Sequence, residues 1–100
     1  MAKNYSYSYV EAYYEYFVNY DFYLIEKGYS TEKSNRIQKK IEKIIEENLV
    51  LYPDMFELAK GSKTIRKFTV EDDIIYYKVN HEQKEIYILH VQQDRQNRFI

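Results

Sequence analysis

The sequence predicts an α+β fold in which an antiparallel sheet carries a helical hairpin on one face. Rings and hydroxyls alternate with period two in residues 5–9, which is typical of a strand. Residues 11–27 and 31–50 then carry apolar side chains at helical spacing. In residues 64–91, three strand-like runs are separated by short polar turns. We therefore expect the order strand, helix, helix, strand, strand, strand, in a single domain spanning residues 1–100.

The first predicted helix runs from Glu11 to Lys27 and has apolar side chains on two arcs. At about 100° per residue, the main arc consists of Tyr13, Tyr16, Phe17, Tyr20, Tyr23 and Leu24. A second arc consists of Tyr14, Val18, Phe22 and Ile25. A helix that only lies on a sheet needs one apolar stripe. The helix is wedged between the sheet and the second helix, or one arc is an exposed patch that a partner protein or a second copy covers, and the two can both hold.

The second predicted helix is capped by Ser30 or Thr31 and continues to about residue 48 or 50. On it, Ile37, Ile41, Ile44, Ile45 and Asn48 follow one another at helical spacing. Gly28 ends the preceding helix, and the link of residues 28–30 is so short that the two helices should form an antiparallel hairpin. A basic stripe, Lys33, Arg36, Lys40 and Lys43, borders the isoleucines. These cations either line the edge of the apolar face, with Glu32 and Arg36 as an ion pair, or meet an acidic partner segment.

The last third of the chain predicts a three-stranded antiparallel meander. Tyr52-Pro53-Asp54 marks a turn, and residues up to Gly61 form an irregular loop. The predicted strands are Thr64–Val70, Ile74–Val79 and Glu85–Val91. The turns between them are short enough for two consecutive hairpins.

Composition narrows the class of protein. The chain is 45% hydrophobic and 31% charged, so it should fold, and its net charge of −1 gives no overall attraction for phosphates. There is no cysteine for disulfide or thiolate chemistry and no apolar run long enough for a membrane span, so we expect a cytoplasmic protein without a membrane partner. Thirteen Tyr and five Phe are more rings than a core this small needs, which favours a surface that binds a partner.

Several short segments, in their order and spacing, resemble the RelE/ParE toxin superfamily. They begin with Val10-Glu11-Ala12 at the helix start and Tyr52-Pro53 after the second helix. The strand segments are Ile65-Arg66-Lys67-Phe68, Ile75-Tyr76-Tyr77-Lys78-Val79 and Ile86-Tyr87-Ile88-Leu89-His90-Val91, followed by Arg95-Gln96-Asn97. The resemblance implies the toxin of a bacterial type II toxin–antitoxin module, of the plasmid-stabilisation kind. Such a toxin inhibits growth by binding an essential target and is neutralised by a cognate antitoxin.

The departures from the family pattern bear on the target. Members that cut mRNA on the ribosome generally carry Arg beside the third strand, a basic residue after the last strand, and Tyr or His near the C-terminus. Here those neighbourhoods read Asp73-Ile74, Gln93-Asp94 and Asn97-Arg98-Phe99-Ile100. RNA cleavage needs a group that takes the 2′-OH proton and cations that hold the phosphate charge. We therefore favour a ParE-like toxin that acts on DNA gyrase. The alternatives are a RelE-like ribosome-dependent mRNA endoribonuclease and an inactive binding module on the same fold.

The site residues are predicted from the second arc of the first helix and the basic residues, together with the resemblance. The target-binding set is predicted to be Arg66, Lys67, Arg95 and Gln96, and the antitoxin-binding set Tyr14, Val18, Phe22 and Ile25. In the endoribonuclease alternative, His90 and Arg95 are the weak catalytic candidates, with Arg66 and Lys67 beside them. The expected partners are an antitoxin and either DNA gyrase or the ribosome with its mRNA, in a homodimer or a heterotetramer with the antitoxin. No cofactor or metal is expected, because the two histidines match no ligand spacing.

His90 and a cluster of basic residues keep two interpretations each. His81 is interpreted as a solvated turn residue, and His90 as a structural histidine, with contact to the target as its alternative. The densest positive charge lies at Lys60, Lys63, Arg66 and Lys67, which Arg95 and Arg98 could join. This group is either a phosphate-sized binding patch or a charged strand edge that prevents aggregation.

Overall fold

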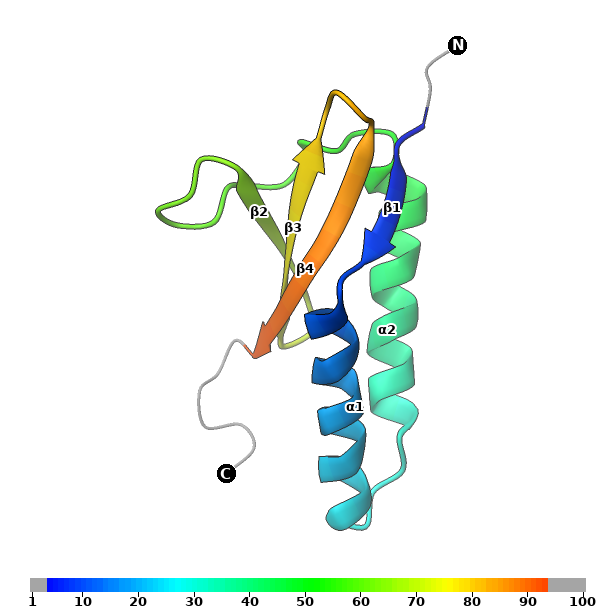
Figure 1. The fold of residues 1–100 in the computed structure, drawn as a ribbon. Helices are drawn as coiled ribbons and strands as arrows, with labels where there is room; N and C mark the ends of the chain where they lie inside the picture. Colours follow the sequence, from blue (N-terminus) through cyan, green and yellow to red (C-terminus); the bar gives the residue numbers. More distant parts are fainter. Residues whose placement is uncertain (1–3, 94–100) are drawn as a thin grey trace.

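The computed structural model describes residues 4–93 and contains the predicted elements in the predicted order (Figure 1). The helices are α1 (Glu11–Glu26) and α2 (Glu32–Ile44), and α2 continues into a π-helical segment, η1 (Ile45–Leu49). The strands are β1 (Ser6–Tyr9), β2 (Ile65–Val70), β3 (Asp73–Asn80) and β4 (Glu85–Gln93). The α+β class is therefore confirmed. No helix in the described part of the chain is long and apolar enough to cross a membrane.

The four strands form one mixed sheet in the order β1-β4-β3-β2. The meander of β2, β3 and β4 is antiparallel, as predicted. However, β1 runs parallel to β4, with Tyr7 opposite Ile86, so the prediction of a purely antiparallel sheet is wrong at this strand. The alternation of rings and hydroxyls gives a strand's faces but not its direction. The two helices that follow β1 return the chain across the sheet, and a crossover of this kind joins parallel neighbours.

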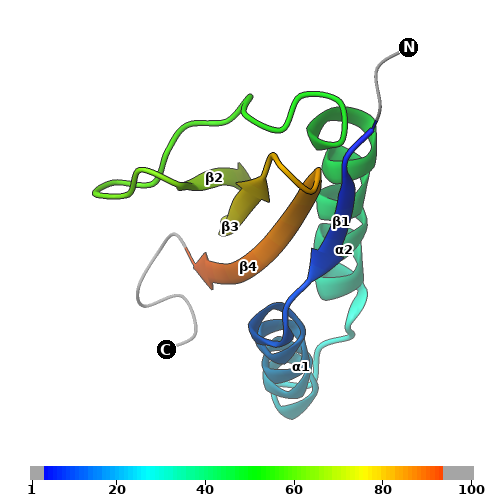
Figure 2. The same ribbon diagram turned by 45° about the horizontal axis from the view of Figure 1, so that its top comes forward.

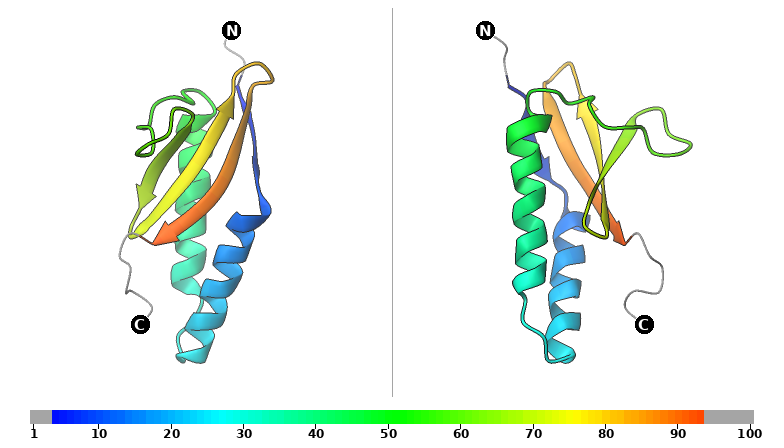
Figure 3. Two further views of the ribbon diagram at one scale, coloured as in Figure 1. Left: turned by 60° about the vertical axis from the view of Figure 1, so that its left-hand side comes forward. Right: turned by 180° about the vertical axis from the view of Figure 1, so that it is seen from behind.

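The helical hairpin covers one face of the twisted sheet and projects beyond its end (Figures 2 and 3). The core between the layers combines the buried arc of α1, the isoleucines of α2 and alternate residues of the strands. Ile41, Ile45, Ile75, Ile86 and Ile88 are fully buried in it. Gly28 has a φ of 80° and ends α1, as predicted from a residue without a Cβ. The hairpin thus holds α1 with one face against β4 and its opposite face away from the core.

The end of the second helix differs from a regular α-helix. In η1, the N–H of Val50 donates to the carbonyl of Ile45 at 3.0 Å, five residues back. The wider turn keeps Ile45, Leu49 and Val50 buried together. The carbonyl of Val50 then accepts the N–H of Tyr5 at 3.0 Å, which connects the start of β1 to the helix end.

The edge strand β2 is partly covered by the loop that precedes it. Residue Leu58 forms a bridge with Arg66, and Lys67 N–H donates to the carbonyl of Glu57 at 3.0 Å. Ala59 N–H donates to the carbonyl of Ile65 at 2.8 Å. This loop therefore blocks part of the strand edge from pairing with another chain.

Candidate functional site

The largest exposed apolar surface of α1 is formed by its second arc. Tyr14, Val18, Phe22 and Ile25, which we name the α1 stripe, are 54%, 51%, 63% and 60% exposed. The opposite arc is buried, and Tyr13 and Phe17 are each only 3% exposed. The prediction of an exposed patch is confirmed, and because α1 also contacts both β4 and α2, the two interpretations hold together. The projecting hairpin explains this, because only one side of α1 reaches β4 and α2.

The α1 stripe is held in place at its N-terminal end by ring contacts. The Tyr14 ring makes edge contacts with Tyr9 and Tyr13, with centroids 5.8 and 5.7 Å apart. A hollow of about 530 Å³ is lined by Glu11, Tyr14, Glu15, Val18 and Asn19. The stripe therefore begins at a fixed ring and continues along an open surface.

The basic stripe on α2 is used in part within the chain. Arg36 donates two hydrogen bonds of 3.0 Å to Glu71 in the β2–β3 turn, and Lys40 Nζ adds a third at 3.0 Å. Arg36 thus pairs with Glu71 rather than with the predicted Glu32. These hydrogen bonds lower the pKa of Glu71 to about 2. Two of the four cations consequently hold a turn of the sheet.

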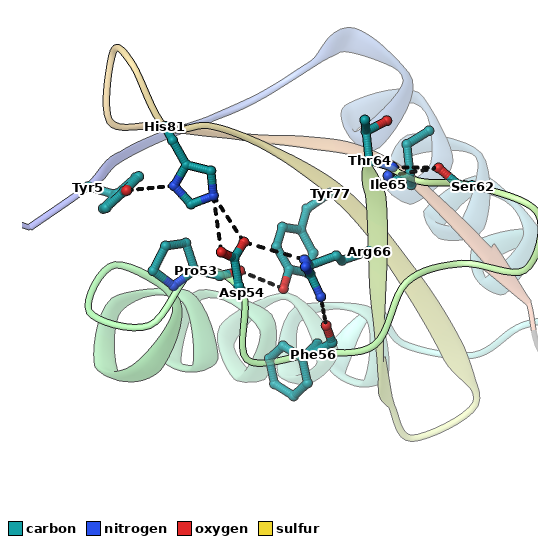
Figure 4. Close-up of polar contacts among 10 residues, drawn as sticks. All are labelled: Tyr5, Pro53, Asp54, Phe56, Ser62, Thr64, Ile65, Arg66, Tyr77 and His81. Atoms are coloured by element: carbon teal, nitrogen blue, oxygen red, sulfur yellow. Dashed lines mark hydrogen bonds and ion pairs between the residues drawn. The ribbon is translucent and has the colours of Figure 1, made fainter.

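Arg66 belongs to a polar cluster that joins four separate segments (Figure 4). Its Nη1 donates to the carbonyl of Phe56 at 2.7 Å, and its Nε lies 3.4 Å from Asp54. Asp54 also contacts Nε2 of His81 at 3.1 Å, and Nδ1 of His81 lies 2.7 Å from the hydroxyl of Tyr5. His81 is exposed in its turn, as predicted, but both ring nitrogens have partners within the chain. The arrangement ties the loop after η1 to β1, β2 and the β3–β4 turn.

Lys67 lies on the other face of the sheet, in a row with two rings. Lys67 on β2 lies opposite Tyr76 on β3, and Tyr76 lies opposite His90 on β4. Tyr77, next to Tyr76, is fully buried, so this row faces away from the helices. The rings of Tyr76 and His90 stack with centroids 6.2 Å apart and an angle of 21°.

This row revises the predicted sites. His90 is exposed, and both of its interpretations stay predictions. Arg66 pairs with the buried Tyr77 and therefore lies on the helix side, while Lys67 lies on the open side. The structure brings Lys67 and His90 onto one face and separates Arg66 from both. Arg95, Gln96 and Arg98 lie outside the described residues.

Sequence reasoning missed Tyr76 and Asp54. The signal for Tyr76 was the alternation of the third strand, in which the residue beside a buried Tyr must face outward. The register between β3 and β4 shifts between Tyr76 and Tyr77, so that Tyr76 lies opposite His90 and Tyr77 lies opposite Ile88. Asp54 sits in a loop, where no periodicity indicates its contacts. Among residues 4–93, no group of three metal-ligating side chains comes together.

Comparison with known proteins finds similarity in structure. No protein-family model matches the sequence, and no curated protein matches it in sequence. A chain of the toxin–antitoxin complex RelBE2 from Mycobacterium tuberculosis matches with a TM-score of 0.65 at 12% identity, covering 93% of this chain and 94% of that one. A chain of the chromosomal ParDE system of P. aeruginosa matches with a TM-score of 0.66 at 18% identity, covering 90% and 96%. The isolated E. coli RelE toxin matches with a TM-score of 0.55 at 12% identity, covering 92% and 86%.

Proposed function

Because this chain has the RelE/ParE toxin fold, we propose that it is the toxin of a type II toxin–antitoxin module, neutralised by a cognate antitoxin. The similarity to the isolated E. coli RelE toxin supports the toxin role, because that structure holds the toxin alone. The similarity to chains of the RelBE2 and ParDE systems supports an antitoxin as partner. The oligomeric state is proposed to be a homodimer or a heterotetramer with the antitoxin.

The exposed α1 stripe is the observation that carries the antitoxin proposal. Four large apolar side chains lie on one face of α1, each more than half exposed. Burying a fully exposed side chain of this kind contributes about 1.5–3 kcal/mol, so covering the exposed half of each contributes roughly half of that, and a partner that covers all four gains a substantial part of its affinity. A monomer has no use for this row, since the opposite arc of α1 already supplies its core contacts.

For the target, we favour binding of DNA gyrase over cleavage of mRNA. Cleavage requires cations and a proton acceptor at one phosphate. Arg66, which precedes Lys67 in β2, is held by Asp54 and the carbonyl of Phe56 on the opposite face. Lys67, on the open face, has its Nζ 4.0 Å from Glu57. The predicted target-binding set of Arg66, Lys67, Arg95 and Gln96 stays a prediction, with Lys67 as its member on the open face.

The row of Lys67, Tyr76 and His90 favours the mRNA endoribonuclease as second candidate. Stacked rings on an open sheet can extend to an unpaired base, and a neighbouring lysine can hold a phosphate. His90 would then supply the proton transfer. This candidate needs further cations from beyond the described residues or from the ribosome.

Induction of the gene alone tests the proposal. We expect growth arrest that co-expression of the neighbouring open reading frame relieves. Under the gyrase proposal, the arrest comes with DNA damage signalling while translation continues. Collapse of translation, with codon-positioned mRNA cuts that disappear in His90→Ala, would instead establish the endoribonuclease. Absence of any arrest would contradict the toxin role.

A further inference from the structure

We infer that the α1 stripe binds an amphipathic helix whose apolar face is flanked by Lys and Arg. The inference rests on the proposed function only in naming the antitoxin as the protein that supplies this helix. The charge of the partner follows from α1 itself.

The geometry of the stripe suits a helix lying along it. Its members are separated by four, four and three residues, so they stay on one side of α1. The stripe extends about 17 Å from Tyr14 to Ile25, which is roughly three turns of a partner helix. The hollow beside Tyr14 and Val18 gives room for one large apolar side chain of that helix. Helices that pack side by side use this four-and-three spacing in both partners.

On α1 the charged residues beside the stripe are all acidic, while Lys39 and Glu42 of α2 line a hollow next to Tyr14 and offset each other there. Residues 11–26 include Glu11, Glu15, Asp21 and Glu26 and contain no Lys or Arg. At about 100° per residue, Glu15 and Glu26 lie on one side of the stripe and Asp21 lies on the other, with Glu11 at its start. None of these carboxylates forms an ion pair within residues 4–93. Oδ1 of Asp21 is moreover buried without a hydrogen-bond donor in the described chain. The negative charge beside the stripe is therefore left for a partner to neutralise.

The same charge disfavours a second copy of this chain. If two α1 helices packed antiparallel across a two-fold axis, Glu15 of one copy would approach Glu26 of the other. Each such pair is repulsive, and no basic residue of α1 relieves it. A helix with Lys and Arg along its flanks meets the same apolar row with attraction on both sides.

Two synthetic helical peptides of about 20 residues, which cover the stripe with a margin, test this inference. Both carry leucines at four-and-three spacing, and their flanking positions hold Lys in one and Glu in the other. We expect the wild-type protein to bind the Lys-flanked peptide about tenfold or more tightly than the Glu-flanked one. In Glu15→Lys/Glu26→Lys the preference should reverse. The matched control is Glu47→Lys/Glu82→Lys, which makes the same change of net charge at exposed residues away from α1 and should keep the wild-type preference.

The inference is overturned if neither peptide binds or if Glu15→Lys/Glu26→Lys still prefers the Lys-flanked peptide. It is also overturned if the preference reverses equally in Glu47→Lys/Glu82→Lys. It is also overturned if the protein dimerises and Phe22→Asp abolishes the dimer, because the stripe would then bind a second copy. A separate measurement of growth arrest distinguishes failure of this inference from failure of the proposed function. A toxic protein without the charge preference contradicts only the inference, while a charge preference in a protein without toxicity contradicts only the toxin role.

Discussion

Arg36 on α2 donates two hydrogen bonds to Glu71, which occupies the β2–β3 turn with a φ of 54°. Few residues other than glycine adopt this backbone conformation, and the side chain of Glu71 is held by both Arg36 and Lys40. The pair joins the far end of the β2–β3 hairpin to the helical layer.

This contact predicts a loss of stability in acid. The pKa of Glu71 is lowered from 4.5 to about 2 in the folded protein. Its stabilising contribution is therefore complete above about pH 4.5 and is lost as the pH falls toward 2. Because the pair is solvated, we expect only about 1 kcal/mol. Urea unfolding of the wild type and of Glu71→Gln should differ by this amount at pH 7 and converge near pH 2, and a constant difference would contradict the assignment.

The core position of Ile41 predicts a large effect of substitution. Ile41 is fully buried, so Ile41→Ala should cost about 2–5 kcal/mol and Ile41→Asp should unfold the domain. Ile44 serves as the matched control, because it is partly exposed and Ile44→Asp should be tolerated better. Circular dichroism during thermal unfolding measures the stability of the Ile41 and Ile44 variants. Equal stability of the two Asp variants would show that the two isoleucines do not differ in burial as the structure has it.

Tyr76 and Tyr77 predict opposite outcomes for the same substitution. The hydroxyl of the buried Tyr77 donates to the carbonyl of Pro53 at 2.9 Å, and burial raises the pKa of Tyr77 to about 12. Tyr77→Phe should lower the free energy of unfolding by about 1 kcal/mol, because that carbonyl loses its donor. Tyr76→Phe, on the open face, should change it by less than about 0.5 kcal/mol. The comparison fails if chemical denaturation ranks the two in the other order.

The α1 stripe predicts a surface effect rather than a folding effect. Phe22→Asp should leave the free energy of unfolding within about 0.5 kcal/mol of wild type, since Phe22 is 63% exposed. Binding of a hydrophobic dye should fall, because one of the four exposed side chains is removed. Phe17→Ala, on the buried arc of the same helix, should cost about 3–5 kcal/mol. A destabilised Phe22→Asp would place this side chain in the core.

The helices and strands were predictable because their periodicities are local. Tyr13, Phe17, Tyr20 and Leu24 are buried on the arc that helical spacing assigned to the core. The parallel pairing of β1 was not predictable, because alternation is the same in either direction. The π-helical turn was missed for a similar reason, since Ile45 and Leu49 also fit an α-helix.

The site was predictable only where it lies on one element. The α1 stripe follows from the sequence of a single helix. The row of Lys67, Tyr76 and His90 needs the register of three strands and the shift at Tyr76, which depend on tertiary packing. The separation of Arg66 from Lys67 follows from strand alternation, but the acidic loop that holds Arg66 has no periodic signal.

Neutralisation of the protein by its neighbouring gene product tests the central proposal most directly. The measurement is growth after induction of the wild type or of Val18→Glu/Phe22→Glu, each with and without the neighbouring open reading frame. We predict that both arrest growth alone, because the exposed stripe is not part of the core, and that the neighbouring product rescues only the wild type. Equal rescue of both proteins would show that the antitoxin does not bind the α1 stripe, and normal growth of cells that express the wild type alone would contradict the toxin role itself.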